Sequence, residues 1–439
     1  MWRFLWMRPV AERTAGLGTR RSALGLLLVL AAGSANAQGD STWRQYSAAG
    51  DSARVHGDWK AYKHYAEILY RELNGHPGTV LAQARAAAQL RDTAAAMKWL
   101  RMYAAAGLVR DMDADSLLAP VRGAKGWREL LARISKSREA VSRAKVAFTI
   151  PDSLFVAEDI TYDSVGKRFF LSSIREGRIV SVKNGRTEKF VADSGGRSMM
   201  ALAADGRRGT LWATAAGLPE AQDSLAWDGT EVQRFTLPAG ELVGVYSLPA
   251  DSNHDVYGDM TLARDGDLLF TNSVGGQLYV IKSGRDHIDT LVPAGVFASP
   301  QEPAVAADGK RVFVPDYIRG IAIVDRASGK VSWLGNEAHA AINGIDGLVV
   351  AGRSLIAVQN GVIPNRVIRL ELDASMTRIV RWSTLEANTP QLREPTHGVL
   401  VGDKFYFIAT SGWDRFAPDG TITPGAALEK PVVMVIEVR

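Results

Sequence analysis

The chain has 439 residues, which is too long for one ordinary hydrophobic core, so we expect two domains. A hydrophobic share of 46% and a charged share of 23% are typical of a globular protein and argue against a disordered or fibrous one. The formal net charge is +5, and the absence of cysteine excludes disulfides and thiol chemistry.

The N-terminal segment predicts export. It carries five arginines, then a short apolar run from Leu24 to Ala32 and the small-residue motif Ala35-Asn36-Ala37. This pattern is typical of a signal peptide over residues 1–37, too short to span a bilayer, and Arg20-Arg21 also fits a twin-arginine signal. Removing its five arginines and one glutamate from totals of 52 basic and 47 acidic side chains leaves 47 and 46. We therefore expect a nearly neutral periplasmic or extracellular protein, with no membrane span and no basic footprint for nucleic acid.

Residues 38–145 have a helical composition, rich in Ala, Arg, Leu and Lys. The segments 57–70 and 91–104 match at an offset of 34 residues, which pairs Asp58 with Asp92 and Tyr65 with Trp99. A period of 34 with Asp ahead of an Ala- and aromatic-rich helix resembles a tetratricopeptide repeat. A plain helical bundle fits the same composition, and in both cases the aromatic side chains belong to the core. This domain is a candidate for binding a protein partner.

Residues 151–439 change to short β-rich runs with period-2 alternation and Asp-Gly turns at Asp205, Asp265 and Asp308. Six units each read as a polar start, an apolar strand, a turn, a second apolar strand, and a third strand. The apolar pairs of the predicted second strands are Phe169-Phe170, Leu211-Trp212, Leu268-Leu269, Val312-Phe313, Leu355-Ile356 and Phe405-Tyr406. Units of about 40–50 residues are typical of propeller blades. We therefore predict a mainly β protein, a six-bladed β-propeller preceded by a small α-helical domain.

A propeller would bring polar residues from distant parts of the chain to one axis. The first strand of each blade lines the central channel, so the residue at its start lies at one mouth of the channel. The polar residues at these starts include Asp159 and five candidate site residues, Glu158, Asp259, Glu302, Asp346 and His397. Asp159, Asp259 and Glu302 share one register, whereas Glu158 and Asp346 lie one position off it.

Acids gathered at one axis repel each other unless a cation compensates them, so we predict a divalent metal ion held by Glu158, Glu302 and Asp346. Carboxylate oxygens favour calcium, with magnesium or manganese as alternatives, and a histidine ligand would admit zinc. Asp259 and His397 are then the candidate catalytic residues for proton transfer. Each candidate also has a structural alternative: Asp346 and Asp259 could cap strands, Glu158 and Glu302 could be solvated, and His397 could be a hydrogen-bonded core residue.

The blade sequences, Glu158 and the Ile345-Asp346-Gly347 motif resemble the senescence marker protein, gluconolactonase and luciferin-regenerating enzyme family over residues 151–439. That resemblance implies a six-bladed propeller with one catalytic divalent metal on the axis, and often lactonase or esterase activity. Glu158 and Asp346 match the first and third metal ligands of the family. Glu302 stands where the family has Asn, and Gly258 replaces another expected Asn.

Three functions remain open. The first is a metal-dependent hydrolase of a lactone, such as a sugar lactone, or a small ester. The second is a non-catalytic exported protein that binds a ligand or protein partner with the propeller mouth and helical repeats. The third is a propeller with a purely structural metal. Serine-hydrolase, zinc-protease, nucleotide-loop and dinucleotide motifs are absent from the sequence.

Overall fold

The computed structural model describes residues 38–192, 196–222, 228–237, 239–248 and 255–438. The predicted signal peptide, residues 1–37, lies outside these described residues. None of the described helices combines the length and apolar character that a membrane crossing requires.

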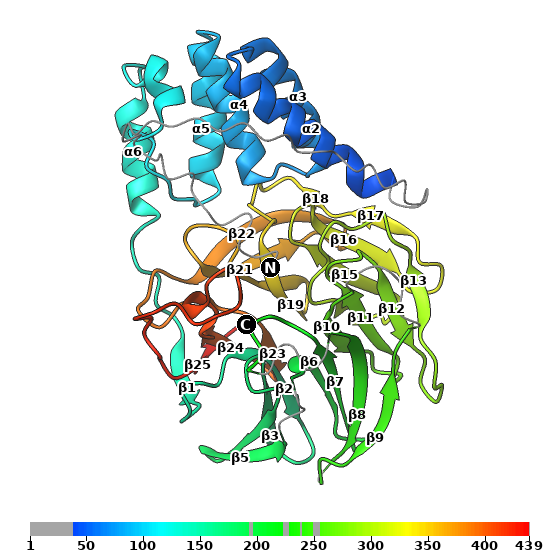
Figure 1. Ribbon diagram of the computed structural model, residues 1–439. Helices are drawn as coiled ribbons and strands as arrows, with labels where there is room; N and C mark the ends of the chain where they lie inside the picture. Colours follow the sequence, from blue (N-terminus) through cyan, green and yellow to red (C-terminus); the bar gives the residue numbers. More distant parts are fainter. Residues whose placement is uncertain (1–37, 193–195, 223–227, 238, 249–254, 439) are drawn as a thin grey trace, which may run out of the picture.

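The chain forms an N-terminal helical region followed by six small antiparallel sheets arranged around one centre (Figure 1). The helices are α2 (Gln38–Val55), α3 (Trp59–Glu72), α4 (Pro77–Gln89), α5 (Thr93–Ala105), the 3-10 helix η1 (Ser116–Val121) and α6 (Trp127–Lys136). The predicted fold class, a six-bladed β-propeller preceded by a helical domain, is confirmed.

The 34-residue repeat corresponds to two equivalent helix starts. Asp58 caps α3 by accepting a hydrogen bond from the backbone N–H of Ala61, and Asp92 caps α5 through Ala95 in the same way. A capping Asp satisfies one of the backbone donors that a helix start leaves without a partner. Leu100, Met112 and Leu118 belong to a separate buried cluster, so the helical region has a core of its own.

Five sheets follow the order of the chain, and each takes its strands in sequence from the centre outward. Blade 1 contains β2 (Ala157–Asp163), β3 (Arg168–Ser173), β4 (Ile179–Lys183) and β5 (Arg186–Val191); blade 2 contains β6 (Ser198–Asp205), β7 (Thr210–Ala216), β8 (Thr230–Thr236) and β9 (Leu242–Tyr246); blade 3 contains β10 (Tyr257–Leu262), β11 (Leu268–Asn272), β12 (Leu278–Ile281) and β13 (Asp289–Val292); blade 4 contains β14 (Ala304–Val305), β15 (Arg311–Asp316), β16 (Gly320–Asp325) and β17 (Val331–Trp333); blade 5 contains β19 (Ile345–Ala351), β20 (Ser354–Gln359), β21 (Arg366–Leu372) and β22 (Arg378–Ala387). The short strand β18 (Gly335–Asn336) joins blade 5 in parallel with β22.

Blade 6 closes the ring with strands from both ends of the propeller sequence. Its order is β23 (Gly398–Val401), β24 (Lys404–Thr410), β25 (Val432–Glu437) and finally β1 (Lys145–Thr149). The first strand of the propeller therefore precedes Pro151, the predicted start of that domain. The 3-10 helix η2 (Trp413–Arg415) lies in the connection between β24 and β25.

The predicted second-strand pairs all lie on the second strand of a blade, and the inner strands contact one another in cyclic order. Buried clusters fill the space between successive blades, because both faces of a blade are covered by its neighbours. This packing explains why the second strands read as apolar runs. It also fixes the six inner strands around one axis.

The helical region packs against one side of the ring, beside the yellow and orange blades 4 and 5 (Figure 1). Trp43 and Leu73 share one buried cluster with Ala298 and Ile318, and a second cluster joins Leu108 to blade 5. The two regions are therefore in direct apolar contact.

Candidate functional site at the propeller axis

Bulges at the starts of three inner strands reorient the acidic side chains. The pairing register shifts between Ala157 and Ile160 in β2, between Tyr257 and Met260 in β10, and between Ile345 and Gly347 in β19. A bulge adds an unpaired residue and bends the strand, which changes the direction of the side chains beside it. Four acidic residues of these strands, Glu158, Asp159, Asp259 and Asp346, lie inside these irregular stretches.

His397 and Asp259 form the centre of the site. His397 Nε2 lies 2.6 Å from Asp259 Oδ1, and the two residues are only 1% and 3% exposed. His397 Nδ1 lies 2.9 Å from the backbone carbonyl oxygen of Glu158. Because a carbonyl oxygen can only accept, Nδ1 must carry a proton, and Nε2 is the nitrogen that faces the carboxylate.

The charge around His397 favours its protonated form. Burial alone would lower the pKa of His397, but the carboxylates of Asp259, Asp346 and Asp159 together hold that pKa well above its usual range. The neighbouring carboxylates therefore favour the imidazolium form of this buried ring. It is the positive charge around which the acids of the axis gather.

Asp159 is held by the backbone. Its two carboxylate oxygens each accept a hydrogen bond of 2.6 Å, one from the N–H of Ile160 and one from the N–H of Leu202 in blade 2. Burial raises the pKa of Asp159 to about 7, against the opposing effects of His397 and these two backbone donors. The sequence predicts a register for Asp159 shared with Asp259 and Glu302, but Asp159 is not one of the predicted site residues. Its shared register with Asp259 was the signal that could have included it.

Glu302 is the partly exposed member of the group. Its Oε2 accepts a hydrogen bond of 2.7 Å from the N–H of Leu348, and its own N–H donates to the backbone oxygen of Asp346 at 3.3 Å. Burial of the carboxyl group raises the pKa of Glu302 well above its usual range, and the charge of Asp159 adds to the rise, while His397 opposes it. The raised pKa favours the protonated form of Glu302.

Asp346 is fully buried and lies beside these groups. Its Oδ2 accepts a hydrogen bond of 2.7 Å from Asn360, whose Oδ1 accepts one of 3.0 Å from the hydroxyl of Tyr317. Gly347 follows it because a side chain has no room there: a Cβ would lie 2.9 Å from the backbone oxygen of Thr396. No sequence signal identified Asn360 or Tyr317, since both come from strand ends outside the blade starts.

Glu158 takes a different direction. Its carboxylate accepts a hydrogen bond from the indole N–H of Trp413, in the connection between β24 and β25. Throughout the part of the chain that the structure describes, no three His, Asp or Glu side chains are placed to hold a metal ion. Glu158, Glu302 and Asp346 therefore do not form a coordination site as they stand. The oxygen-rich donors suit a divalent cation, and the metal stays a prediction.

Comparisons with known proteins assign no family to this chain. Neither the family models nor the curated protein sequences give a match to this chain. Solved structures share the propeller at low identity. A luciferin-regenerating enzyme is 13% identical with a TM-score of 0.48, covering 67% of this chain and 96% of its own. A PQQ-bound aldose sugar dehydrogenase from Streptomyces coelicolor is 14% identical with a TM-score of 0.45, covering 67% and 97%. A virginiamycin B lyase from Staphylococcus aureus is 12% identical with a TM-score of 0.45, covering 67% and 99%.

Proposed function

We propose that the propeller axis is the active site of a hydrolase that acts on a lactone or a small ester. The observation that carries the proposal is the buried 2.6 Å contact between His397 Nε2 and Asp259 Oδ1. Glu302, whose raised pKa favours its protonated form, lies near this pair. A charged base, a fixed imidazolium and a neutral acid in one place are the groups that acyl transfer to water requires. The resemblance carried by Glu158 and Asp346-Gly347 supports the lactone class.

In this proposal each group has one task. Asp259 accepts a proton from the attacking water as its oxygen bonds to the substrate carbonyl carbon. The His397 imidazolium stabilises the negative charge that develops on the carbonyl oxygen. Glu302 gives its proton to the alkoxide oxygen when the C–O bond of the ester breaks. After the products leave, Asp259 releases its proton and Glu302 takes one up, which restores the starting state.

A divalent cation, calcium first, stays a separate part of the proposal and has no step in this mechanism. Bound metal in the purified protein, measured by mass spectrometry before and after dialysis against EDTA, tests it directly. Export through the predicted signal peptide is likewise a proposal. Cell fractionation with wild-type and Arg20→Lys/Arg21→Lys chains tests both export and the twin-arginine route.

The enzyme proposal is tested with a panel of sugar lactones and aryl esters. We expect Asp259→Asn and His397→Gln each to lower kcat/KM by about 10²–10⁴-fold, the usual contribution of a positioned acid or base. Asp308→Asn, in an exposed turn, is the matched control and should retain wild-type activity. If the folded wild-type chain turns over none of the panel, or if both axial variants keep full activity, the hydrolase proposal is wrong. Ligand or partner binding by the mouth and the helical region would then be the function to test.

A further inference from the structure

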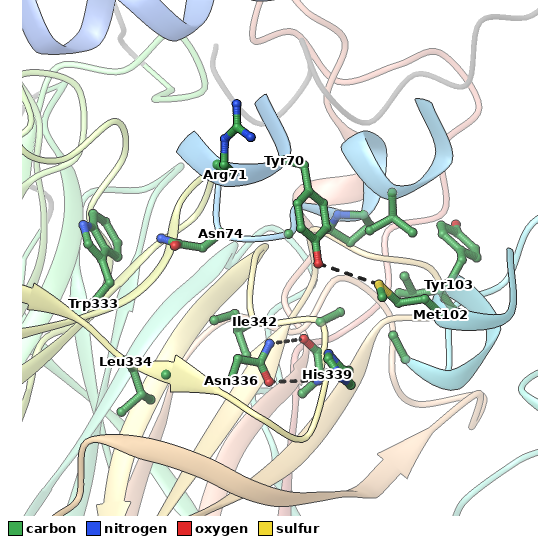
Figure 2. Close-up of a pocket in the computed structure, with 18 residues that line it drawn as sticks. Tyr70, Arg71, Asn74, Met102, Tyr103, Trp333, Leu334, Asn336, His339 and Ile342 are labelled. Carbon is green, nitrogen blue, oxygen red and sulfur yellow. Dashed lines mark hydrogen bonds between the residues drawn. The ribbon is translucent and has the colours of Figure 1, made fainter. Parts of the chain in front are cut away.

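A cavity lies between the helical region and the propeller, away from the axis. Its volume is about 360 Å³, within the range of roughly 300–1,000 Å³ that small-molecule sites occupy. Figure 2 shows Tyr70 of α3 and Tyr103 of α5 on the helical side, with Trp333 and His339 on the propeller side. The aromatic rings come from both regions, so the cavity exists only where the two are docked.

The propeller side of this cavity is built on a constrained loop. The side chain of Asn336 forms two hydrogen bonds with the backbone of Ala340, donating to its oxygen at 2.8 Å and accepting from its N–H at 3.0 Å. His339 lies inside the closed loop with φ of 50°, a conformation that is uncommon for a side-chain-bearing residue. Such conformations persist where the surroundings impose them, and they concentrate at ligand sites. The loop holds the exposed His339 ring at the cavity wall.

The charge next to the cavity is positive and has no matching carboxylate. Arg366 is 1% exposed, and its guanidinium donates to the carbonyl oxygens of Ala106 and Gly107 and to Gln359. Its Nη2 has no hydrogen-bond partner among the described residues, and none of their carboxylates lies within ion-pair distance. Burial lowers the pKa of Arg366 to about 10, so the group keeps its charge at neutral pH.

The wall residues do not neutralise this charge. Ala106, whose carbonyl binds Arg366, itself lines the cavity, and so does Arg71. None of the 18 lining residues is acidic. A buried cation without an anionic partner is unfavourable, and an anion placed nearby would stabilise it. The cavity therefore combines aromatic walls with the positive charge of Arg71, while Arg366 lies behind Ala106, outside the lining, with its guanidinium over the ring of Trp382.

We propose that this cavity binds a small aromatic carboxylate. The rings of Tyr70, Trp333 and His339 supply surfaces on which a planar body can pack. The charge of Arg71 in the wall, with that of Arg366 behind Ala106, favours a carboxylate over a neutral group. This site lies outside the axial cluster and does not depend on the hydrolase proposal.

Isothermal titration calorimetry with 2-naphthoate and its neutral analogue 2-naphthamide tests the proposal on the full mature chain. We expect the carboxylate to bind roughly tenfold tighter than the amide, since only the carboxylate gains from the positive charge. His339→Gly removes a ring where the backbone conformation suits glycine, so folding is retained, and it should weaken 2-naphthoate binding by roughly tenfold. Arg366→Met keeps an apolar stem and should reduce the preference for the carboxylate, since Arg71 remains in the wall.

The control is Arg234→Ala, which alters a different cavity. That cavity has a volume of about 210 Å³ and is lined by Arg234 and Trp212. Unchanged 2-naphthoate affinity in this variant, with weakened binding in His339→Gly, supports the proposal. No binding up to about 1 mM, equal affinity for the amide, or undiminished binding by His339→Gly overturns it. If Arg366→Met does not fold, the comparison of the two ligands and His339→Gly decide the result.

Discussion

At the residue scale, the axis is a group of side chains that hold protons more tightly in the folded protein than in the unfolded chain. The pKa of Asp159 is raised to about 7 by burial, and burial also raises the pKa of Glu302. The pKa of His397 is raised because its carboxylate neighbours outweigh its burial. One imidazolium and its protonated acids thus replace what would otherwise be a cluster of repelling anions.

These shifts predict that the free energy of unfolding falls as pH rises from about 5 to about 8. Asp159 and Glu302 titrate near about 4 when unfolded, so the stability they give is complete below that pH and is lost as pH rises through their folded pKa values. His397 acts in the same direction, with full stability below about 6.5 and a loss as pH rises through its raised pKa. We expect a total loss of order a few kcal/mol, measured by urea unfolding at several pH values.

Glu302→Gln isolates the contribution of one acid, because the amide resembles the protonated carboxyl and still accepts from Leu348. This variant should flatten the pH dependence and be more stable than wild type at pH near 8. Exposed Glu337→Gln should leave the slope unchanged. A wild-type slope in Glu302→Gln would show that Glu302 is ionised across this range. Asp373, whose pKa is about 2, titrates too low to contribute.

The site could be predicted from the sequence only as far as strand positions reach. The blade repeat placed Asp259 and His397 at the same axis, and the structure brings their side chains into contact. The blade repeat could not separate Glu158 from Asp159. The bulge in β2 decides which carboxylate interacts with the charge of His397 and which accepts a hydrogen bond from Trp413. Asn360 and Trp413 also escaped prediction, since nothing in their local sequence distinguishes them from strand-end and loop residues.

At the scale of the elements, the blades could be predicted from the sequence because each second strand is covered on both faces and must be apolar. Phe170 and Phe313, for example, are fully buried between blades. The closure of the ring could not be predicted from the sequence. The strand β1 looks like a linker after the last helix, and only its pairing with β25 shows that it completes blade 6. Pairing between the two ends of a domain leaves no periodic signal in either segment.

This closure predicts a difference between two truncated chains. Residues 140–439 retain β1, whereas residues 151–439 lack it and expose the paired edge of β25, together with the space that buried Ile150 fills. Removing a buried side chain such as Ile150 costs about 2–5 kcal/mol before the lost strand pairing is counted. We expect the shorter chain to be less stable by more than about 3 kcal/mol in urea unfolding. Both chains lack the helical region, so each is the control for the other, and equal stability would contradict the role of β1.

At the scale of the whole molecule, buried hydrogen bonds connect the helical region with the propeller. Asn343 donates to the carbonyl oxygens of Leu73 and Ile318, and Gln359 donates to those of Ala341 and Asn343. Arg366 then joins Gln359 to Ala106 in the helical region. The residue after Gln359 is Asn360, which binds Asp346 at the axis. Gln359 and Asn360 are adjacent at the end of β20. Gln359 thus contacts the domain interface, and Asn360 contacts the axial cluster.

Gln359→Leu tests whether this connection makes the two regions unfold together. The substitution keeps a buried apolar volume but leaves Arg366 Nε and two carbonyl oxygens without their partner, which should cost about 3 kcal/mol or more. Since those groups join the two regions, we expect the single thermal transition of wild type to split into two. Hydrogen exchange should show faster exchange in α5, where contact with Arg366 is weakened, while β7 and β11 stay protected.

Exposed Gln391→Leu should leave the transition and the exchange unchanged. A single transition at the wild-type temperature in Gln359→Leu would mean that the apolar contacts of Trp43, Leu73 and Leu108 hold the two regions together on their own.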